Sequence, residues 1–153
     1  MLARQTVNCL FNVSNDDGRE LPLYLRENSL LVLGPVRSHV AERPADPLTV
    51  EAFVTAEAAF ALRTDAGRLD LRCRREGPRT VLEASATPGS GPDFDIPTLV
   101  LRLHHAGPPG GATADGHRLP RLDPDALDRT DRGWAVDGRT VVLKARAREL
   151  RIE

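Results

Sequence analysis

The sequence predicts an all-β fold, an antiparallel β-sandwich of about ten strands with Greek-key connections. Three observations favour it. Short stretches in which apolar and polar residues alternate recur along the 153 residues, turn-forming residues separate these stretches, and no segment has a long helical pattern. Two helix-like windows, 56–61 and 124–128, are too short to be stable as independent helices. A chain of this length suits one domain with a buried core.

The first half of the chain is divided by turn signals into six expected strands. A polar run, Ser14-Asn15-Asp16-Asp17-Gly18, ends the first of them, and Thr64-Asp65-Ala66-Gly67 resembles a short hairpin loop. Beyond that loop Leu69, Leu71 and Cys73 face one way and charged residues face the other, which is typical of a half-buried strand. The expected strands cover residues 6–13, 21–25, 30–35, 48–54, 59–63 and 68–74.

The second half continues the same pattern. The dipeptide Asp137-Gly138, a strong hairpin signal, lies between the expected strands 134–136 and 139–145. Two segments, 87–97 and 107–116, are rich in glycine and proline and are expected to be loops. The other expected strands of this half cover residues 80–86, 98–104 and 149–152.

The composition excludes several classes of function. The formal net charge of −1 gives no overall attraction to nucleic acid or to a membrane surface. No apolar run approaches the roughly 18 residues needed to span a bilayer, and the N-terminus lacks the continuous apolar stretch of a secretory signal. We therefore expect a cytoplasmic protein with no nucleic-acid or membrane partner. No motif for a cofactor is present, and none is expected.

Residues 21–35, L-P-L-Y-L-R-E-N-S-L-L-V-L-G-P, are the most specific part of the sequence. They contain two apolar strands joined by the charged turn Arg26-Glu27-Asn28-Ser29. This segment resembles L-P-[LV]-Y-V-R-[DEP]-[NG]-[ST]-[IL]-[IL], which lies downstream of the catalytic barrel in glycoside hydrolase family 31, the α-glucosidases and α-xylosidases. The order of the later strands, up to the Asp137-Gly138 turn, is similar to the C-terminal half of family 31 α-xylosidases.

The resemblance implies a domain organisation and a function. Residues 21–153 would be a C-terminal β-sandwich like those appended to the family's (β/α)₈ barrel, and residues 1–20 are expected to be a poorly defined N-terminal segment. The barrel that carries the family's two catalytic aspartates has no counterpart here. Trp134 is followed by Ala135-Val136-Asp137, which does not match the family's W-x-D-M-like nucleophile motif. No catalytic residue is therefore transferred to this chain.

Three interpretations follow from this resemblance. The first is a non-catalytic accessory module of a family 31 α-glycosidase, nearest the α-xylosidases, and on this interpretation the chain is expected to be a truncated gene product or a fragment. The second is a stand-alone module that binds carbohydrate. The third is an interaction module that docks onto a separately encoded barrel. The expected partners are accordingly a (β/α)₈ catalytic barrel and, on the second interpretation, glycans.

Tyr24 and Arg26 are the candidate surface residues. In the alternation of residues 21–26 the leucines share one face, and Tyr24 and Arg26 lie on the other. The two side chains would either cover the sheet and contact the barrel, or contact a glycan directly.

The other polar clusters are expected to be structural. His104 and His105 are adjacent in a strand and point to opposite faces, so they would not bind one ion, and with His117 and Asp115 nearby we expect no metal site. The pair Asp93 and Asp95 is expected to form a polar surface turn. Cys9 and Cys73 are expected to be small buried thiols. The aromatic residues expected to fill the core are Phe53, Phe60, Phe94 and Trp134.

Overall fold

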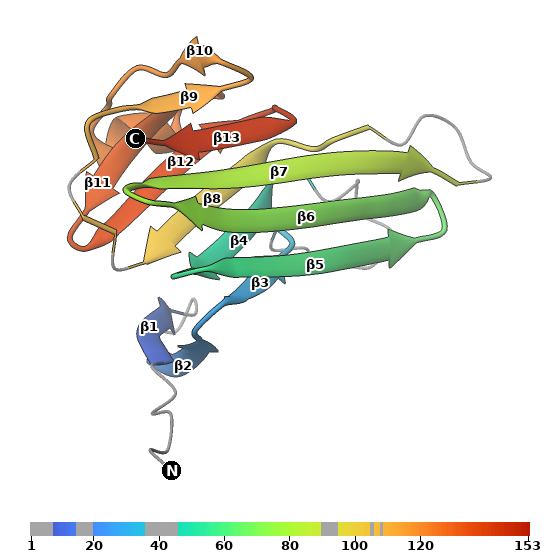
Figure 1. Cartoon of the computed structure of the whole chain (residues 1–153), viewed down its shortest axis with the longest axis horizontal. Coiled ribbons are helices and arrows are strands. Elements are labelled where there is room, and N and C mark those ends of the chain that lie inside the picture. The colour runs from blue at the N-terminus through green and yellow to red at the C-terminus, as the bar shows by residue number, and fades with distance from the viewer. Residues whose placement is uncertain (1–7, 15–19, 36–45, 90–94, 105, 108) are drawn as a thin grey trace.

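The computed structural model shows two β-sheets packed face to face, with the six-stranded sheet in front of the five-stranded sheet in Figure 1. It describes residues 8–14, 20–35, 46–89, 95–104, 106–107 and 109–153, and for residues 8–14 and 20–23 it describes the backbone. These residues form thirteen strands and one short helix, which confirms the predicted all-β sandwich. No helix among the described residues is long and apolar enough to span a membrane.

The six-stranded sheet is a meander extended at one side by two short strands and a strand from the C-terminus. Its long central strands agree with the alternation in the sequence, although each is longer than expected. The order across the sheet is β10 (His117–Arg118), β9 (Ala112–Ala114), β13 (Glu149–Ile152), β7 (Arg79–Pro88), β6 (Gly67–Glu76) and β5 (Glu57–Thr64).

The five-stranded sheet crosses behind the first sheet at an angle (Figure 1). It holds one parallel pair, β4 with β8, whereas the sequence predicted antiparallel pairing. The reason is the connection: the chain leaves β4, builds the β5–β7 meander in the other sheet and returns in the same direction, which supplies the long crossover that a parallel pair needs. The order is β11 (Gly133–Asp137), β12 (Thr140–Ala145), β8 (Leu99–His104), β4 (Leu48–Phe53) and β3 (Ser29–Leu33).

The core lies between the two sheets and consists of alternate residues of each strand. Leu69, Leu71 and Cys73 of β6 are fully buried there, as the sequence predicted, and they face Val50 and Leu101 of the other sheet's strands. Since apolar burial contributes about 25 cal/mol per Å², this shared layer is the main source of stability. The aromatic residues predicted to fill the core have different positions. Trp134 is part of this layer and Phe60 packs at its margin, whereas Phe53 is buried in a second cluster. Phe94 lies outside the described residues.

The two helix-like windows of the sequence, 124–128 and 56–61, have different structures. The window 124–128 is helix α1 (Pro124–Asp128), held by buried Leu127 against β11. The window 56–61, by contrast, belongs almost entirely to strand β5, because its alternating side chains can reach the core from an extended backbone. Strands β9 and β10 were not expected, because they are short and lie in the glycine-rich part of the chain.

The charged turn of residues 26–29 connects two sheets. It follows β2 (Glu20–Arg26), which pairs with β1 (Asn8–Ser14) in a separate two-stranded sheet, and it leads into β3 of the sandwich. Asn28 has a left-handed backbone (φ 57°), and its side-chain oxygen accepts hydrogen bonds from the backbone N–H groups of Thr55 (2.9 Å) and Ala56 (2.8 Å). Asn tolerates this conformation better than most residues. The turn is thereby fastened to the β4–β5 connection.

Candidate docking face and its buried glutamate–histidine pair

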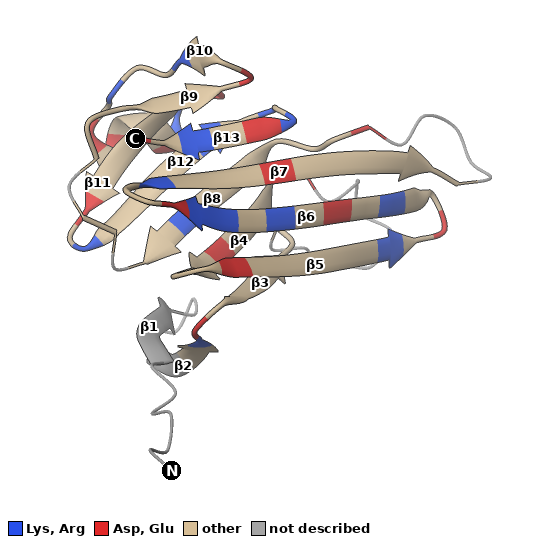
Figure 2. Cartoon of the chain, in the orientation of Figure 1, with Lys and Arg blue, Asp and Glu red and all other residues tan. Residues whose placement is uncertain are grey.

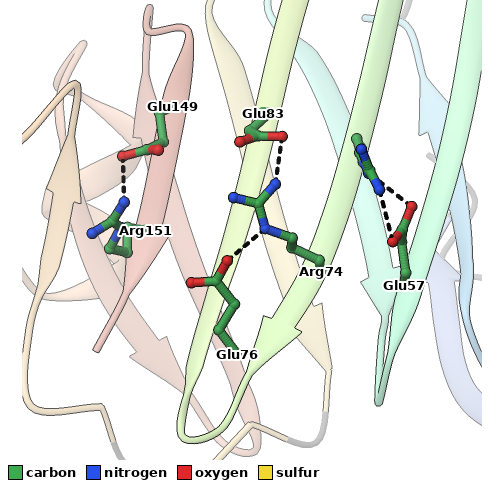
Figure 3. A network of polar contacts seen from close by, with 7 residues as sticks. Glu57, Arg74, Glu76, Glu83, Glu149 and Arg151 are labelled. Carbon is green, nitrogen blue, oxygen red and sulfur yellow. Dashed lines mark hydrogen bonds and ion pairs between the residues drawn. The ribbon is translucent and has the colours of Figure 1, made fainter.

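The outer face of the six-stranded sheet is covered by ion pairs (Figures 2 and 3). Arg74 of β6 donates to Glu76 (2.6 Å) and to Glu83 of β7 (2.8 Å). Arg72 binds both carboxylate oxygens of Glu57 on β5, at 2.7 and 3.0 Å. Hydrogen bonds from the two arginines lower the pKa of the Glu57 and Glu76 carboxyls below the usual 4.5. These charged groups are partly exposed to water, so this face is stable in contact with solvent and each ion pair contributes little to stability.

An open trough of about 600 Å³ lies on this charged face. Its lining includes the small residues Ala59 and Ala61 of β5 and the charged residues Arg68, Asp70 and Arg72 of β6. Arg68 is already paired with Asp70 at 2.6 Å. The trough therefore offers hydrogen-bonding groups whose charges are largely neutralised within the sheet.

The outer face of the five-stranded sheet has a different chemistry. Its centre is a buried pair: Glu51 of β4 and His104 of β8, each with a side chain 7% exposed, are joined by a contact of 2.6 Å between Oε2 and Nε2. An ionised carboxylate only accepts, so His104 Nε2 donates. The other ring nitrogen lies 3.2 Å from the hydroxyl oxygen of Thr140 on β12. The pair is thus tied across three strands of the sheet.

Arg102 lies beside this pair and extends toward the surface. Its Nε is 3.3 Å from Glu51 Oε1, too poorly aligned to count as a hydrogen bond, and that nitrogen is buried. The side chain as a whole is 39% exposed. The guanidinium fork therefore presents donors at the surface of a face whose neighbours are partly apolar.

The half-buried apolar residues around Arg102 follow from the strand register. Leu31 is opposite Glu51, Val142 is opposite Arg102, and Thr49 is opposite Val100, so all lie on the same outer face. We call this surface the docking face; it is made of Leu31, Leu33, Thr49, Glu51, Val100, Arg102, His104, Thr140 and Val142, with Lys144 and Asp137 at its β12–β11 margin.

Both ends of the docking face are bordered by other elements. At one end Leu25 of β2 is buried against Phe53 and Leu31. At the other end Leu122 and Leu127 lie over β11 at Gly133, where an added Cβ would be 2.7 Å from Leu122 Cδ1. A side chain at position 133 would therefore require the end of the Leu122 side chain to move, and glycine avoids this contact.

The two residues predicted as a surface, Tyr24 and Arg26, lie on the solvent side of β2. Tyr24 is 70% exposed and is the single exposed large hydrophobic side chain of the described residues. Arg26 is also exposed, while Leu25 between them is buried against the sandwich. Over residues 24–26 the alternation is as the sequence predicted.

The histidines and acidic residues considered for a metal are spread over separate elements. His104 is in the buried pair, His117 is exposed on β10, and His105 lies outside the described residues. Asp115 (φ 48°) binds the backbone N–H groups of Arg148 and Glu149 at 2.9 and 2.8 Å, a structural role. Among the residues that the structure describes, no three His, Cys, Asp or Glu side chains form a cluster suited to a metal ion.

The acidic turn and the cysteines are described in part. Asp95 is exposed and accepts a hydrogen bond from the backbone N–H of Ile96, while Asp93 lies outside the described residues. Cys73 is a buried free thiol in β6, and burial raises its pKa from 9.0 to about 12. It is therefore inert as a nucleophile at neutral pH. The side chain of Cys9 is outside the described part of the chain.

Sequence reasoning missed the Glu51–His104 pair. The two residues are 53 positions apart in the chain, and the parallel alignment of β4 with β8 brings them together. A signal was present: Glu51 and Phe53 alternate on the outer side of β4, and a large apolar residue beside an acid on that side indicates a covered face.

The fold and the site together define the structural class of the protein. It is a two-sheet β-sandwich with one outer face covered by solvated ion pairs and one outer face that is partly apolar. No family model and no curated protein matches this sequence. Solved structures do match its fold. The GH31 dextranase of Flavobacterium johnsoniae, in complex with glucose, aligns with a TM-score of 0.70 and 14% identity over 89% of this chain and 21% of its own. A variant of that dextranase in complex with isomaltotriose gives the same values.

A second enzyme aligns over more of this chain. The α-1,4-glucan lyase of Gracilariopsis lemaneiformis matches with a TM-score of 0.59 and 13% identity, over 97% of this chain and 20% of its own. The chain thus spans about one fifth of the length of the enzymes that it matches. It shares the fold of an all-β region in a family 31 dextranase, as the resemblance of residues 21–35 implied.

Proposed function

We propose that this chain is a non-catalytic accessory β-sandwich of a family 31 α-glycosidase, and that the docking face and Tyr24 contact a (β/α)₈ catalytic barrel. The observation that supports this most directly is the contrast between the two outer faces. One is covered with solvated ion pairs, while the other surrounds a buried Glu51–His104 pair with half-buried apolar residues. The cores of protein interfaces are likewise depleted in charge and enriched in apolar, aromatic and arginine side chains.

A structural role also fits the acids of the sandwich. Retaining hydrolysis needs two carboxyl groups about 5–5.5 Å apart, one of them free to attack the sugar. Glu51 is buried and engaged by His104, and Glu57, Glu76 and Glu83 are held by arginines. These carboxylates are positioned to hold strands together.

The finer assignment within the family is part of the same proposal. The motif of residues 21–35 and the order of the later strands favour an α-xylosidase-like parent, active in carbohydrate metabolism. The structures with the same fold belong to a dextranase and a glucan lyase, so the parent's sugar is left to experiment.

Two measurements test the accessory role. The pure 153-residue chain is expected to show no turnover of aryl α-xylosides, aryl α-glucosides or dextran. It is expected to bind, in sedimentation or calorimetry, a family 31 barrel produced without its own C-terminal sandwich. Turnover by the pure chain contradicts the non-catalytic role, and failure to bind any of a panel of such barrels contradicts docking.

Matched variants then locate the contact. Arg102→Glu places a carboxylate where the docking face presents a guanidinium, and Tyr24→Ala removes the exposed ring, so each is expected to weaken barrel binding about tenfold or more. Arg68→Glu, on the solvated face, is the control and should leave binding unchanged. Equal losses for Arg102→Glu and Arg68→Glu would show that the docking face is not the contact.

A second candidate, glycan binding, is favoured by the trough over Ala59 and Ala61. Its guanidinium and carboxylate groups can hydrogen-bond to sugar hydroxyls, and Phe60 lies in its lining. Calorimetry with isomaltotriose, maltose and xyloglucan fragments tests it. Heat that disappears in Arg72→Ala supports glycan binding at the trough, and flat traces across the panel contradict it.

A further inference from the structure

Strand β5 forms one free edge of the six-stranded sheet. Among the described strands β6 is its only hydrogen-bonded neighbour, and Figure 1 shows β5 as the outermost long strand of this sheet. Its eight residues, E-A-A-F-A-L-R-T, pair with β6 without a break in register. Edge strands of monomeric proteins are usually short, bulged or protected by lysine or proline. Strand β5 has none of these protections.

The alternation of hydrogen-bonded pairs between β5 and β6 shows which backbone groups of β5 point to the free edge. The N–H of Arg75 donates to the carbonyl of Ala56 at 2.7 Å, so the pair formed by these two residues is a hydrogen-bonded one. Hydrogen-bonded and non-hydrogen-bonded pairs alternate along an antiparallel ladder. Ala58, Phe60, Leu62 and Thr64 therefore bond to β6. The N–H and C=O groups that point to the free edge belong to Glu57, Ala59, Ala61 and Arg63.

These outward-facing residues complement a second copy of themselves. In an antiparallel pair centred on Phe60, Glu57 of one copy is opposite Arg63 of the other, and Ala59 is opposite Ala61. Every outward N–H and C=O then has a partner, because the four paired residues are the four that face the edge. The same register brings opposite charges together at both ends, and Figure 2 shows the acidic and basic ends of β5.

We propose that this chain forms a two-fold symmetric homodimer through β5, with Phe60 at the symmetry axis and Glu57–Arg63 pairs at both ends of the shared strand pair. The two six-stranded sheets join into one continuous sheet. Ala59 and Ala61 are small and exposed, so their side chains do not obstruct the approach. Phe60 is half-buried and would bury more of its ring against the same ring of the partner.

The size of this contact sets its strength. A single strand pair buries less surface than the roughly 1,200 Å² of stable interfaces, so the dimer is expected to dissociate on dilution. Complementary charge at both ends then selects the partner and register, since like charges placed directly opposite each other are destabilising. The proposal does not depend on the accessory role above, because it concerns the other sheet and requires no barrel.

The first test is sedimentation velocity of the full 153-residue chain over a roughly hundredfold range of concentration. A reversible monomer–dimer equilibrium is expected. Ala61→Pro removes an N–H that faces the edge while leaving the ladder to β6, and it is expected to weaken the dimer at least about tenfold with an unchanged melting temperature. Ala61→Thr keeps the N–H and should dimerise like the parent chain.

The second test reads the register directly by charge exchange. Arg63→Glu places Glu opposite Glu in its own dimer, and Glu57→Arg places Arg opposite Arg, so each variant alone is expected to be monomeric. Mixed together, they form a heterodimer with two Glu–Arg pairs, and dimer should reappear. A parent chain that is monomeric at every concentration overturns the proposal, as does a dimer insensitive to Ala61→Pro or a mixture that stays monomeric.

Discussion

The two outer faces of this sandwich use charge in opposite ways. On the six-stranded sheet, arginines and glutamates pair at the surface, where water screens them and each pair contributes little. On the five-stranded sheet, Glu51 and His104 pair under cover, where water no longer shares in stabilising the carboxylate. The first arrangement keeps a sheet soluble and resists unwanted contacts. The second ties three strands together and is surrounded by half-buried apolar residues.

The burial of Val81 shows that the charged face is also a packing layer. Val81 lies on the outer side of β7, directly opposite Arg74 on one neighbour and Arg151 on the other, yet it is fully buried. Long arginine side chains cover apolar surface with their methylene groups while the guanidinium remains in water. The ladder of ion pairs therefore orients these stems as well as neutralising charge.

The largest expected effect comes from removing one partner of the buried pair. His104→Leu leaves the Glu51 carboxylate buried with Arg102 as a poorly aligned neighbour, and we expect a loss of about 3–5 kcal/mol in the free energy of unfolding. Urea denaturation followed by the fluorescence of Trp134 measures it. The double variant Glu51→Leu with His104→Leu removes both polar partners and should recover most of the loss. A double variant less stable than His104→Leu would contradict this account.

A second effect, confined to high pH, is expected from the interior beneath the charged face. Burial raises the pKa of Cys73 to about 12 in the folded protein, against 9.0 for a free thiol. The folded state therefore disfavours the thiolate, so this contribution to stability is complete below pH 9 and is lost as the pH rises toward 12. Each pH unit in that window corresponds to about 1.4 kcal/mol.

Alkaline denaturation in a Cys9→Ser background measures the Cys73 effect. The melting temperature should fall more steeply above pH 9 in this background than in Cys73→Ala, because the alanine variant has no thiol to ionise at this position. Reaction of Cys73 with an aromatic disulfide reagent at neutral pH should occur only on unfolding. Rapid labelling of the native protein would show that the layer between the two sheets is open to water.

How much of this the sequence could predict depended on the range of the interactions. The alternation of Leu69, Leu71 and Cys73, the Asp137-Gly138 turn (Gly138 φ 57°) and the strand 149–152 follow from neighbouring residues, and all were predicted. The parallel pairing of β4 with β8 depends on where a long crossover returns, and no local pattern contains that information. The Glu51–His104 pair depends on this pairing, so it was missed with it.

The exposure of Tyr24 and Arg26 could also be predicted, because it depends on neighbouring residues in the same strand. Leu25 turns inward against Phe53, and because side chains alternate in a strand, Tyr24 and Arg26 must turn outward. The segment 56–61 shows where local pattern is not enough: its alanine-rich sequence is compatible with a helix, and its pairing with β6 decides for a strand. Local pattern thus predicted which side of an element is apolar better than it predicted what lies opposite.

The smallest expected effect tests whether the charged face is as solvated as its geometry indicates. Hydrogen bonds from arginine lower the pKa of Glu57 and Glu76, so their contribution to stability is present above 4.5 and is lost as the pH falls through the lower folded values. NMR titration of the side-chain carboxyl carbons should give both pKa values below 4.5 at low salt, and closer to 4.5 in about 1 M salt, where the Debye length is only about 3 Å. Arg74→Ala should raise the pKa of Glu76 and leave that of Glu57 nearly unchanged, because Arg72 holds Glu57 with two hydrogen bonds. If salt moved neither pKa, the ion pairs would be shielded from the solvent, and the two faces of the sandwich would be more alike than this structure indicates.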